Sequence, residues 1–245
     1  MNISECYKIL GLEPGASMKE VRQAYRKLAL RYHPDKDSTQ KDGDQFKLIT
    51  DAYQLLRDQR KTETKPVQKF SDIYPEDAVT WYDQAEVLFA KRKYREALAQ
   101  YGKATDRLPR YENAWLRKGN CFSNLKRYDD ALVCYDKVLE INPESMSAWN
   151  LKGICLSDLK RYNEALDSFD EAIILNPRHE AVWNFRGVCL YSLKRLEEAI
   201  DSFDKAIKIN PIFAPAWRNK GNVLIKMGNE DEGKRCIEQA KKLQL

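Results

Sequence analysis

Few side chains of this 245-residue protein are suited to acid–base or metal chemistry. The two histidines are His33 and His179, and the six cysteines form no Cys-x-x-Cys pair. Because zinc sites usually rely on such closely spaced pairs, no metal centre is predicted. The sequence also has no glycine-rich phosphate loop and no pattern that pairs a nucleophile with a base. We therefore expect no enzymatic activity in this chain, and no cofactor.

His33 does have a distinctive setting, at the end of a basic segment. The pattern Ser17-x-x-Glu20 is a capping box, which predicts a helix from there to about Tyr32, with Pro34 ending it. One face of this helix is cationic: Lys19, Arg22, Arg26, Lys27 and Arg31. A clustered cationic face favours a fast, salt-sensitive encounter with an acidic protein surface.

Two more helices are predicted around this one. A short helix covers residues 6–10, and a further helix follows a polar loop that runs from Asp35 to Gly43. The later helix has one apolar stripe: Phe46, Ile49, Ala52, Tyr53 and Leu56. An antiparallel hairpin is the simplest packing of the two longer helices.

His33-Pro34-Asp35 at the end of a basic helix resembles the signature of the J-domain. Tyr7-Lys8-Ile9-Leu10-Gly11-Leu12, Phe46-Lys47-Leu48-Ile49 and Ala52-Tyr53 match the same family, so the resemblance covers residues 3–60. The family usually has a short fourth helix with a basic stretch leading to Tyr-Asp. Here Gln59-Arg60-Lys61 runs into Thr62-Glu63-Thr64-Lys65-Pro66, so a short or missing fourth helix is expected.

The resemblance implies that this segment stimulates ATP hydrolysis by a DnaK-class chaperone, a member of the seventy-kilodalton heat-shock family. In that role His33, Pro34 and Asp35 form the essential contact loop, and Asp35 engages a basic group on the partner's ATPase domain or linker. The residues implied to meet the partner's acidic surface are Arg22, Arg26 and Lys27.

A 34-residue period in the tryptophans organises the rest of the chain: Trp81, Trp115, Trp149, Trp183 and Trp217. Glycine stands four residues after four of the tryptophans, and alanine stands sixteen residues after four of them. Tyrosine, phenylalanine or isoleucine stands twenty residues after all five. Proline follows by twenty-eight in the first four periods, and three of these prolines come after asparagine. Apolar residues at three- and four-residue spacing predict two helices per period, which approach closely at the small residues.

This pattern resembles the tetratricopeptide repeat, which implies an all-α solenoid of stacked helical hairpins. We assign residues 1–60 to the J-domain, 61–77 to a linker, and five repeats to 78–111, 112–145, 146–179, 180–213 and 214–245. The last helix is expected to tolerate solvent through Lys234, Arg235, Glu238 and Lys242, unless this end packs on another molecule.

The repeat positions also explain most of the cysteines. Cys121, Cys155 and Cys189 stand six residues after a tryptophan, and Cys134 and Cys236 stand nineteen after one. This predicts buried packing residues, and free thiols of this kind fit a reducing cytoplasm.

Two periodic charges predict a set of ion pairs. A base stands three residues after each tryptophan except the first, and an acid stands twenty-one residues after the same tryptophans. We predict pairs within each repeat: Lys118–Asp136, Lys152–Asp170, Arg186–Asp204 and Lys220–Glu238. The alternative is that these long side chains extend to water.

The repeat resemblance implies that the first helices line a concave groove. Carried onto this sequence, the lining includes Tyr82, Glu86, Leu116, Asn120, Asn150, Ile154, Asn184, Val188, Tyr191, Arg218 and Asn222. Such a mixture suits an extended peptide or a helix, although any one of these side chains can instead pack between repeats.

A subset of these repeats binds acidic chaperone tails through a Lys/Asn/Asn/Lys/Arg carboxylate clamp. Leu116, Leu151, Ala181 and Phe185 occupy clamp positions here, so tail binding of this kind is not predicted.

Composition limits the remaining classes of function. With 43% hydrophobic and 32% charged residues, wholesale disorder is not expected. The net charge of +5 does not indicate nucleic-acid binding by bulk electrostatics. Neither a membrane span nor a secretory signal is seen, so a cytoplasmic protein is expected. The leading hypothesis is a co-chaperone adaptor; the alternatives are an interaction scaffold with a non-stimulating J-domain and a nucleic-acid-linked adaptor.

Overall fold

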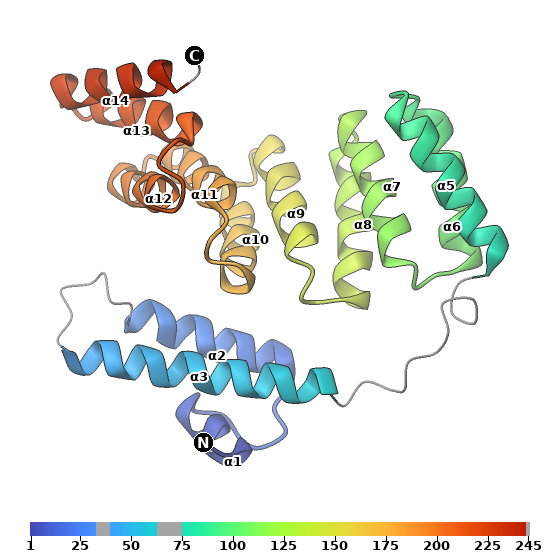
Figure 1. Ribbon diagram of the computed structural model, residues 1–245, viewed down its shortest axis with the longest axis horizontal. Helices are drawn as coiled ribbons and strands as arrows, with labels where there is room; N and C mark the ends of the chain where they lie inside the picture. The colour runs from blue at the N-terminus through green and yellow to red at the C-terminus, as the bar shows by residue number, and fades with distance from the viewer. Residues whose placement is uncertain (33–39, 63–74, 244–245) are drawn as a thin grey trace. The chain divides into compact units, whose positions relative to one another are not determined.

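The computed structural model describes residues 1–32, 40–62 and 75–243 (Figure 1). Within these ranges it has thirteen helices and no strands, which confirms the expected all-α fold. The chain divides into two compact units, Met1–Gln68 and Lys69–Leu245. None of the helices in the described ranges is both long and apolar enough to cross a lipid bilayer.

The first unit contains α1 (Ile3–Ile9), α2 (Met18–Arg31) and α3 (Gln40–Thr62). The predicted cap of α2 is confirmed: the Glu20 amide donates to Ser17 Oγ at 3.3 Å, and the Ser17 amide donates to Glu20 Oε2 at 2.7 Å. Asn2 and Glu5 cap α1 in the same way. Each box satisfies two backbone donors that a helix start leaves unpaired.

Helices α2 and α3 run antiparallel, as predicted (Figure 1). The rings of Tyr25 and Tyr53 stack between them, with centroids 4.4 Å apart and planes 18° apart. The predicted stripe of α3 is also confirmed, because Ile49, Ala52, Tyr53 and Leu56 are buried and Phe46 is half-buried. Stacked rings between two helices resist sliding of one helix along the other.

Helix α3 is longer at its start than the sequence predicts. It begins at Gln40, so the segment from Gln40 to Gly43 is helical rather than part of the loop. One interior glycine costs about 1 kcal/mol, which the rest of a helix of this length offsets. At its other end α3 continues through Gln59-Arg60-Lys61 to Thr62. Residues 63–74, where the family's fourth helix was in question, lie outside the described residues.

The second unit is a series of five helical hairpins, one for each predicted repeat (Figure 1). The second helix of each hairpin packs against the first helix of the next. The hairpins are α5 (Glu76–Ala90) with α6 (Tyr94–Arg107), α7 (Glu112–Asn124) with α8 (Tyr128–Ile141), α9 (Met146–Asp158) with α10 (Tyr162–Leu175), α11 (Glu180–Ser192) with α12 (Leu196–Ile209), and α13 (Ala214–Lys226) with α14 (Glu230–Lys242).

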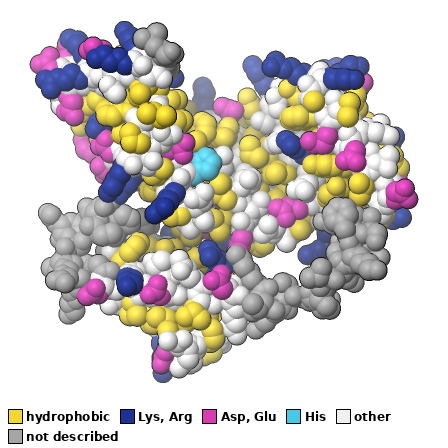
Figure 2. All heavy atoms as spheres, viewed as in Figure 1, with side chains coloured by type: hydrophobic (Ala, Val, Ile, Leu, Met, Phe, Trp, Pro, Cys, Tyr) yellow, Lys and Arg dark blue, Asp and Glu magenta, His cyan; other side chains and the backbone are white. Residues whose placement is uncertain are grey.

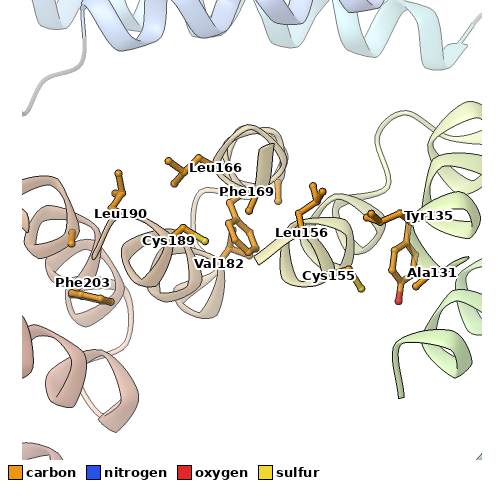
Figure 3. Packing of buried hydrophobic residues seen from close by; sticks show 14 of the residues in the cluster. Ala131, Tyr135, Cys155, Leu156, Leu166, Phe169, Val182, Cys189, Leu190 and Phe203 are labelled. Atoms are coloured by element: carbon orange, nitrogen blue, oxygen red, sulfur yellow. The ribbon is translucent and has the colours of Figure 1, made fainter. Parts of the chain in front are cut away.

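The periodic glycines stand where the two helices of a hairpin meet. A Cβ atom on Gly153 would lie 2.6 Å from a ring carbon of Phe169, and Gly187 meets Phe203 at the same distance. Both rings are buried in the main core of the array (Figure 3). In the last repeat Gly221 instead approaches the carbonyl oxygen of Gly233, which explains why glycine replaces alanine there. The close approach predicted from the sequence is therefore confirmed.

The tryptophan and proline periods arise from one contact. The Trp115 indole N–H donates to the Pro109 carbonyl at 3.0 Å, and Trp149 donates to Pro143 at 3.0 Å. The pairs Trp183–Pro177 and Trp217–Pro211 repeat this bond at 3.0 and 2.8 Å. Each tryptophan therefore anchors the loop that joins its repeat to the preceding one.

The cysteines pack in the core, as predicted. All six are free thiols and all are buried. Burial raises the pKa of Cys121 and of Cys134 to about 12. Cys155 Sγ lies 3.7 Å from Ser123 Oγ in the preceding repeat, so a thiol can also satisfy a hydroxyl between repeats.

The turn between the two helices of each hairpin uses a left-handed residue. In the first four repeats it is Arg92, Lys126, Lys160 or Lys194, with φ between 57° and 61°, and in the fifth it is Gly228. Figure 2 shows basic side chains gathered along the edge where the α5–α6 and α7–α8 hairpins turn. A left-handed conformation disfavours side chains that carry a Cβ atom, so four turns are strained where the fifth is relaxed.

Helix α14 has the polar outer face expected from the sequence. Lys234, Arg235, Glu238 and Lys242 are all exposed. At the position of Lys234 the four earlier repeats have Leu98, Leu132, Leu166 and Ile200. Replacing that apolar residue with lysine leaves no large apolar surface on the outer side of α14.

Candidate functional site

The proposed contact loop of the J-domain falls outside the described residues. His33, Pro34 and Asp35 are therefore known here by sequence and by the helices that flank them. Helix α2 ends at Arg31, with the Tyr32 amide donating to the Leu28 carbonyl at 2.9 Å, and α3 begins at Gln40. The loop is thus attached at both ends to helices that pack on each other.

The basic face of α2 is less open than expected. Arg22 is only 7% exposed, Arg26 is half-buried, and Lys27 is exposed. The side chains of Lys19 and Arg31 are outside the described residues. An arginine can bury its aliphatic stem and still use its guanidinium group. The burial of Arg22 therefore neither supports nor excludes a contact with a partner. Of the three cations implied to meet a partner, Lys27 is the one that is exposed.

The periodic ion pairs exist, but the predicted partners are wrong. Lys152 Nζ lies 2.6 Å from Asp136 Oδ1, Arg186 Nε lies 2.7 Å from Asp170 Oδ1, and Lys220 Nζ lies 2.7 Å from Asp204 Oδ1. Each base therefore pairs with the acid of the preceding repeat and not with the acid of its own. The bases project toward the preceding hairpin, because the second helix of that hairpin packs against the first helix of the next one.

The two ends of this series differ from its middle. Gly102 holds the acid position in the first repeat, so Lys118 donates instead to Thr105 Oγ1 at 3.3 Å and lies 4.6 Å from the Trp115 ring centroid. At the other end, Glu238 pairs with Lys242 in its own helix at 3.1 Å. The predicted pairs Lys118–Asp136 and Lys220–Glu238 are therefore replaced as well.

The first of the predicted groove residues belong to a polar cluster on the first two repeats. Tyr101 donates its hydroxyl to Glu86, and Arg117 Nε lies 3.1 Å from Glu86 Oε1. Burial, and then the bond to Glu86, raise the pKa of Tyr101. Tyr82 lies against Tyr101, with ring centroids 5.7 Å apart. The carboxylate of Glu86 thus already has two partners within the array, Tyr101 and Arg117.

Asn120 has an equivalent structural bond. It accepts from the Tyr135 hydroxyl at 2.9 Å, in the position that Glu86 holds one repeat earlier. In the next two repeats the aromatic residue is phenylalanine, and the facing residues are Ile154 and Val188. At this position a polar residue therefore faces a buried tyrosine, whose hydroxyl needs an acceptor, and an apolar residue faces a buried phenylalanine.

A second series of groove positions joins neighbouring first helices. Asn184 is only 6% exposed and accepts from Asn219 Nδ2 at 2.9 Å. We call the equivalent positions across the four interfaces the first-helix ladder: Tyr82 and Arg117, Leu116 and Leu151, Asn150 and Phe185, and Asn184 and Asn219.

Two of the predicted groove amides have buried atoms at these interfaces. Asn184 is bonded between α11 and α13, while Asn150 Oδ1 is buried with no hydrogen-bond partner among the described residues. Phe185 stands where an amide would be needed to complete the bond to Asn150. The alternative of packing between repeats therefore applies to both residues.

The last of the predicted groove residues lie on α11 and α13. Tyr191 is half-buried, Arg218 and Asn222 are exposed, and Lys226 Nζ lies 4.6 Å above the Tyr191 ring. The sequence prediction included three of these residues and missed Lys226. Its spacing was the available signal, because a residue four positions after Asn222 lies on the same helix face.

The described part of the chain contains no group of three or more His, Cys, Asp or Glu side chains arranged to hold a metal ion. His179 lies in the loop between repeats, as predicted, and forms the N-cap of α11.

Comparison with protein families matches both units. Residues 5–64 match the DnaJ domain, and tetratricopeptide repeat models match residues 112–145, 134–167, 157–211 and 214–245. The first hairpin, α5 with α6, precedes those matches and has the same architecture as the hairpins that follow it.

The curated relatives are similar to the first unit. The human "DnaJ homolog subfamily A member 4" is 50% identical over 60 residues, which are 24% of this chain and 15% of that protein. The "Chaperone protein DnaJ" of Leptospira biflexa is 48% identical over 58 residues, covering 23% of this chain and 16% of that protein. The similarity therefore spans a small part of these relatives.

The solved structures resemble the second unit. MamA from Desulfovibrio magneticus superposes with a TM-score of 0.66 at 19% identity, over 69% of this chain and 96% of that one. YrrB, described as a tetratricopeptide repeat protein with an unusual peptide-binding site, has a TM-score of 0.59 at 24% identity, over 72% and 91% of the two chains. The repeats thus share the fold of these solenoids, and the chain as a whole is a J-domain protein with a C-terminal array of tetratricopeptide repeats.

Proposed function

We propose that this protein is a co-chaperone adaptor of the cytoplasm. Its J-domain stimulates ATP hydrolysis by a DnaK-class chaperone, and its repeats bind a client or partner protein. The observation that carries the proposal is the match of residues 5–64 to the DnaJ domain, with His33-Pro34-Asp35 intact, in one chain with five stacked hairpins. The ATPase activity belongs to the partner, and this chain supplies contacts.

The first unit supports a contact role for the loop. The loop joins two antiparallel helices that the Tyr25–Tyr53 stack fixes against each other. Preorganised ends reduce the entropy that a loop loses on binding. Lys27, exposed on α2, adds attraction to an acidic surface, which should weaken as salt concentration rises.

An ATPase assay tests this role. With a purified bacterial DnaK-class chaperone, the full chain should raise steady-state ATP hydrolysis, and Asp35→Asn should reduce the rate to the basal level. Far-UV circular dichroism should be unchanged. Asp51→Asn is the matched control, because Asp51 is exposed on α3. Full stimulation by the Asp35→Asn variant would refute the assignment.

The cationic face requires a separate measurement. Lys27→Gln should raise the chaperone concentration needed for half-maximal stimulation by about threefold, since one exposed ion pair contributes less than about 1 kcal/mol. The effect should vanish at high salt. Lys47→Gln, an exposed lysine on α3, should leave the concentration unchanged. Equal effects of the two substitutions would remove Lys27 from the interface.

The repeats act as the targeting unit in this proposal. The half-buried and exposed side chains along the first helices offer polar and apolar contacts to an extended segment, and the similar solenoid YrrB is described as having a peptide-binding site. Joining such a unit to a J-domain raises the local concentration of the client near the chaperone. A groove variant, Asn222→Glu, should lose partner capture by the full chain and keep ATPase stimulation. Asn163→Glu, at an exposed asparagine on α10, should keep both.

One observation favours the alternative function, an interaction scaffold with a non-stimulating J-domain. Arg22, one of the three cations implied to meet the chaperone, is only 7% exposed. The wild-type ATPase assay separates the two functions, because a scaffold would leave the basal rate unchanged.

A further inference from the structure

The charge of the first helices changes from one end of the array to the other. Helix α5 has four acidic residues and no lysine or arginine, whereas α13 has three basic residues and no acid. Each of the three first helices between them has one acid and one or two bases. The five first helices together have seven acids and seven bases, but the acids predominate in α5 and the bases in α13.

The basic end has a regular geometry. Arg218, Asn222 and Lys226 follow one another at four-residue intervals on α13, so they share one face of the helix and span about 12 Å. All three are exposed, and Ile225 beside them is 36% exposed. Tyr191 from α11 adjoins this face, because Lys226 lies over its ring. We call Tyr191, Arg218, Asn222 and Lys226 the α13 face.

Two of the three cations on α13 remain open. Lys220 is paired with Asp204 at 2.7 Å. Arg218 makes no ion pair with any described residue, and the ammonium of Lys226 contacts an aromatic ring rather than a carboxylate. The nearest acid along the chain, Glu230, is paired with Lys234 at 2.7 Å. Arg218 and Lys226 thus differ from the periodic bases Lys152, Arg186 and Lys220, each of which meets an acid of the preceding repeat.

We propose that the α13 face is the subsite that binds the acidic part of an extended protein segment. This rests on the proposed function of the repeats as a peptide-binding unit. Arg218 takes a carboxylate in a bidentate geometry, Lys226 takes a second one, and Asn222 between them bonds the main chain. Tyr191 and Ile225 contact apolar side chains that alternate with the acids.

The opposite end of the groove sets the direction of the segment. Helix α5 has no lysine or arginine to offer a carboxylate, and two of its own acids are already paired, Asp77 with Arg107 and Glu86 with Arg117. The acidic part of a bound segment therefore lies at α13 and not at α5. This sets the orientation of the segment along the array. Complementary charge of this kind selects partners and orientation more than it raises affinity.

The test uses three fluorescein-labelled eight-residue peptides with the full chain: alternating leucine with glutamate, with glutamine, or with lysine. Fluorescence anisotropy should show that the glutamate peptide binds tightest and the lysine peptide weakest. Arg218→Gln combined with Lys226→Gln should weaken the glutamate peptide by about tenfold and leave the glutamine peptide unchanged. The matched control is Arg235→Gln combined with Lys241→Gln, which removes the same charge from exposed sites on α14.

Each outcome supports or overturns the proposal. If the glutamine and glutamate peptides bind equally, the groove still binds peptide but the acidic subsite is refuted. If none of the three peptides binds, both the subsite and peptide binding by the repeats are refuted, while the ATPase assay still judges the J-domain. Equal weakening by the α14 control would refute a local role for the α13 face. Tighter binding of a twelve-residue oligothymidylate than of the glutamate peptide would assign the face to nucleic-acid phosphate instead.

Discussion

The ammonium group of Lys152 lies 2.6 Å from the carboxylate of Asp136, a residue of the preceding repeat. The same relationship joins Arg186 to Asp170 and Lys220 to Asp204. Two of these bases also lie near the tryptophan three residues before them, at 5.4 Å from the ring centroid for Lys152 and 5.9 Å for Arg186. The periodic charges therefore connect successive hairpins and do not close individual ones.

A double-mutant cycle will distinguish the two pairings for Arg186. The side chains of Arg186 and Asp170 are only 18% and 20% exposed, so solvent screens this pair less than the others. We expect a coupling energy of about 1 kcal/mol between Arg186→Gln and Asp170→Asn in urea denaturation. The cycle of Arg186→Gln with Asp204→Asn should give a coupling near zero, and the reverse order would contradict the structure.

Gly153→Ala should destabilise the array. The new methyl group would lie 2.6 Å from the Phe169 ring, and overpacking of this kind costs about 1–3 kcal/mol. Gly102→Ala is the control: it is also helical, but no heavy atom lies within 4 Å of its added Cβ atom. That change should stabilise by about 0.5–1 kcal/mol, as alanine does in an open helix position. Thermal unfolding that moves in the same direction for both variants would disprove the close contact.

Lys160→Gly should stabilise the protein by about 1 kcal/mol, because the left-handed conformation penalises a Cβ atom by that amount. The φ angle of Lys160 is 61°, and Gly228 holds the equivalent turn of the last repeat. Lys160→Ala removes the same charge and keeps the Cβ atom, so its stability should stay within about 0.5 kcal/mol of the wild type. If the alanine variant gains as much as the glycine variant, charge and not backbone strain is responsible.

The stability of the array should fall at alkaline pH. In the unfolded chain a thiol ionises near its usual pKa, about 8.5, whereas burial raises the pKa of folded Cys121 and Cys134 to about 12. The folded state therefore keeps protons that the unfolded state releases. The stabilisation is complete below about pH 8.5 and is lost as the pH rises toward 12.

Urea denaturation between pH 8 and pH 10 measures this loss. Cys121→Ala combined with Cys134→Ala should flatten the decline, whatever it does to the stability at pH 8. Iodoacetamide should label neither thiol of the native protein at pH 8.5. An unchanged slope in the double variant would show that other groups carry the alkaline dependence.

Much of the fold could be predicted because its signals repeat within one hairpin. Gly153 and Phe169 stand at fixed distances from Trp149, and the contact between them depends only on how two adjacent helices cross. The cap at Ser17 was equally predictable, because its partner Glu20 is three residues away. Local geometry of this kind can be derived from spacing alone.

The contacts between repeats could not be predicted in this way, because they depend on how one hairpin is rotated against the next. Spacing allowed Arg186 to pair with Asp204, eighteen residues later, or with Asp170, sixteen residues earlier, and the rotation between repeats selects the second. The same rotation buries Asn184 against Asn219, although its helix position predicted an open groove. Arg22 is a similar case, since its place on the polar side of α2 did not reveal its burial.

The ion pairs use the same two positions at three successive interfaces, so they can join any of these repeats that supplies the acid to any that supplies the base. If residues 146–179 were deleted, Arg186 would meet Asp136 as a ready substitute for Asp170. The first-helix ladder has no such interchangeability. The side-chain amide of Asn219 donates to Asn184. Leu116, which holds the position of Asn184 in the second repeat, would offer Asn219 no acceptor. The contacts between first helices therefore depend on which repeats are neighbours, whereas the ion pairs do not. If the repeats were reordered, the surface formed by the first helices would change before the fold was lost.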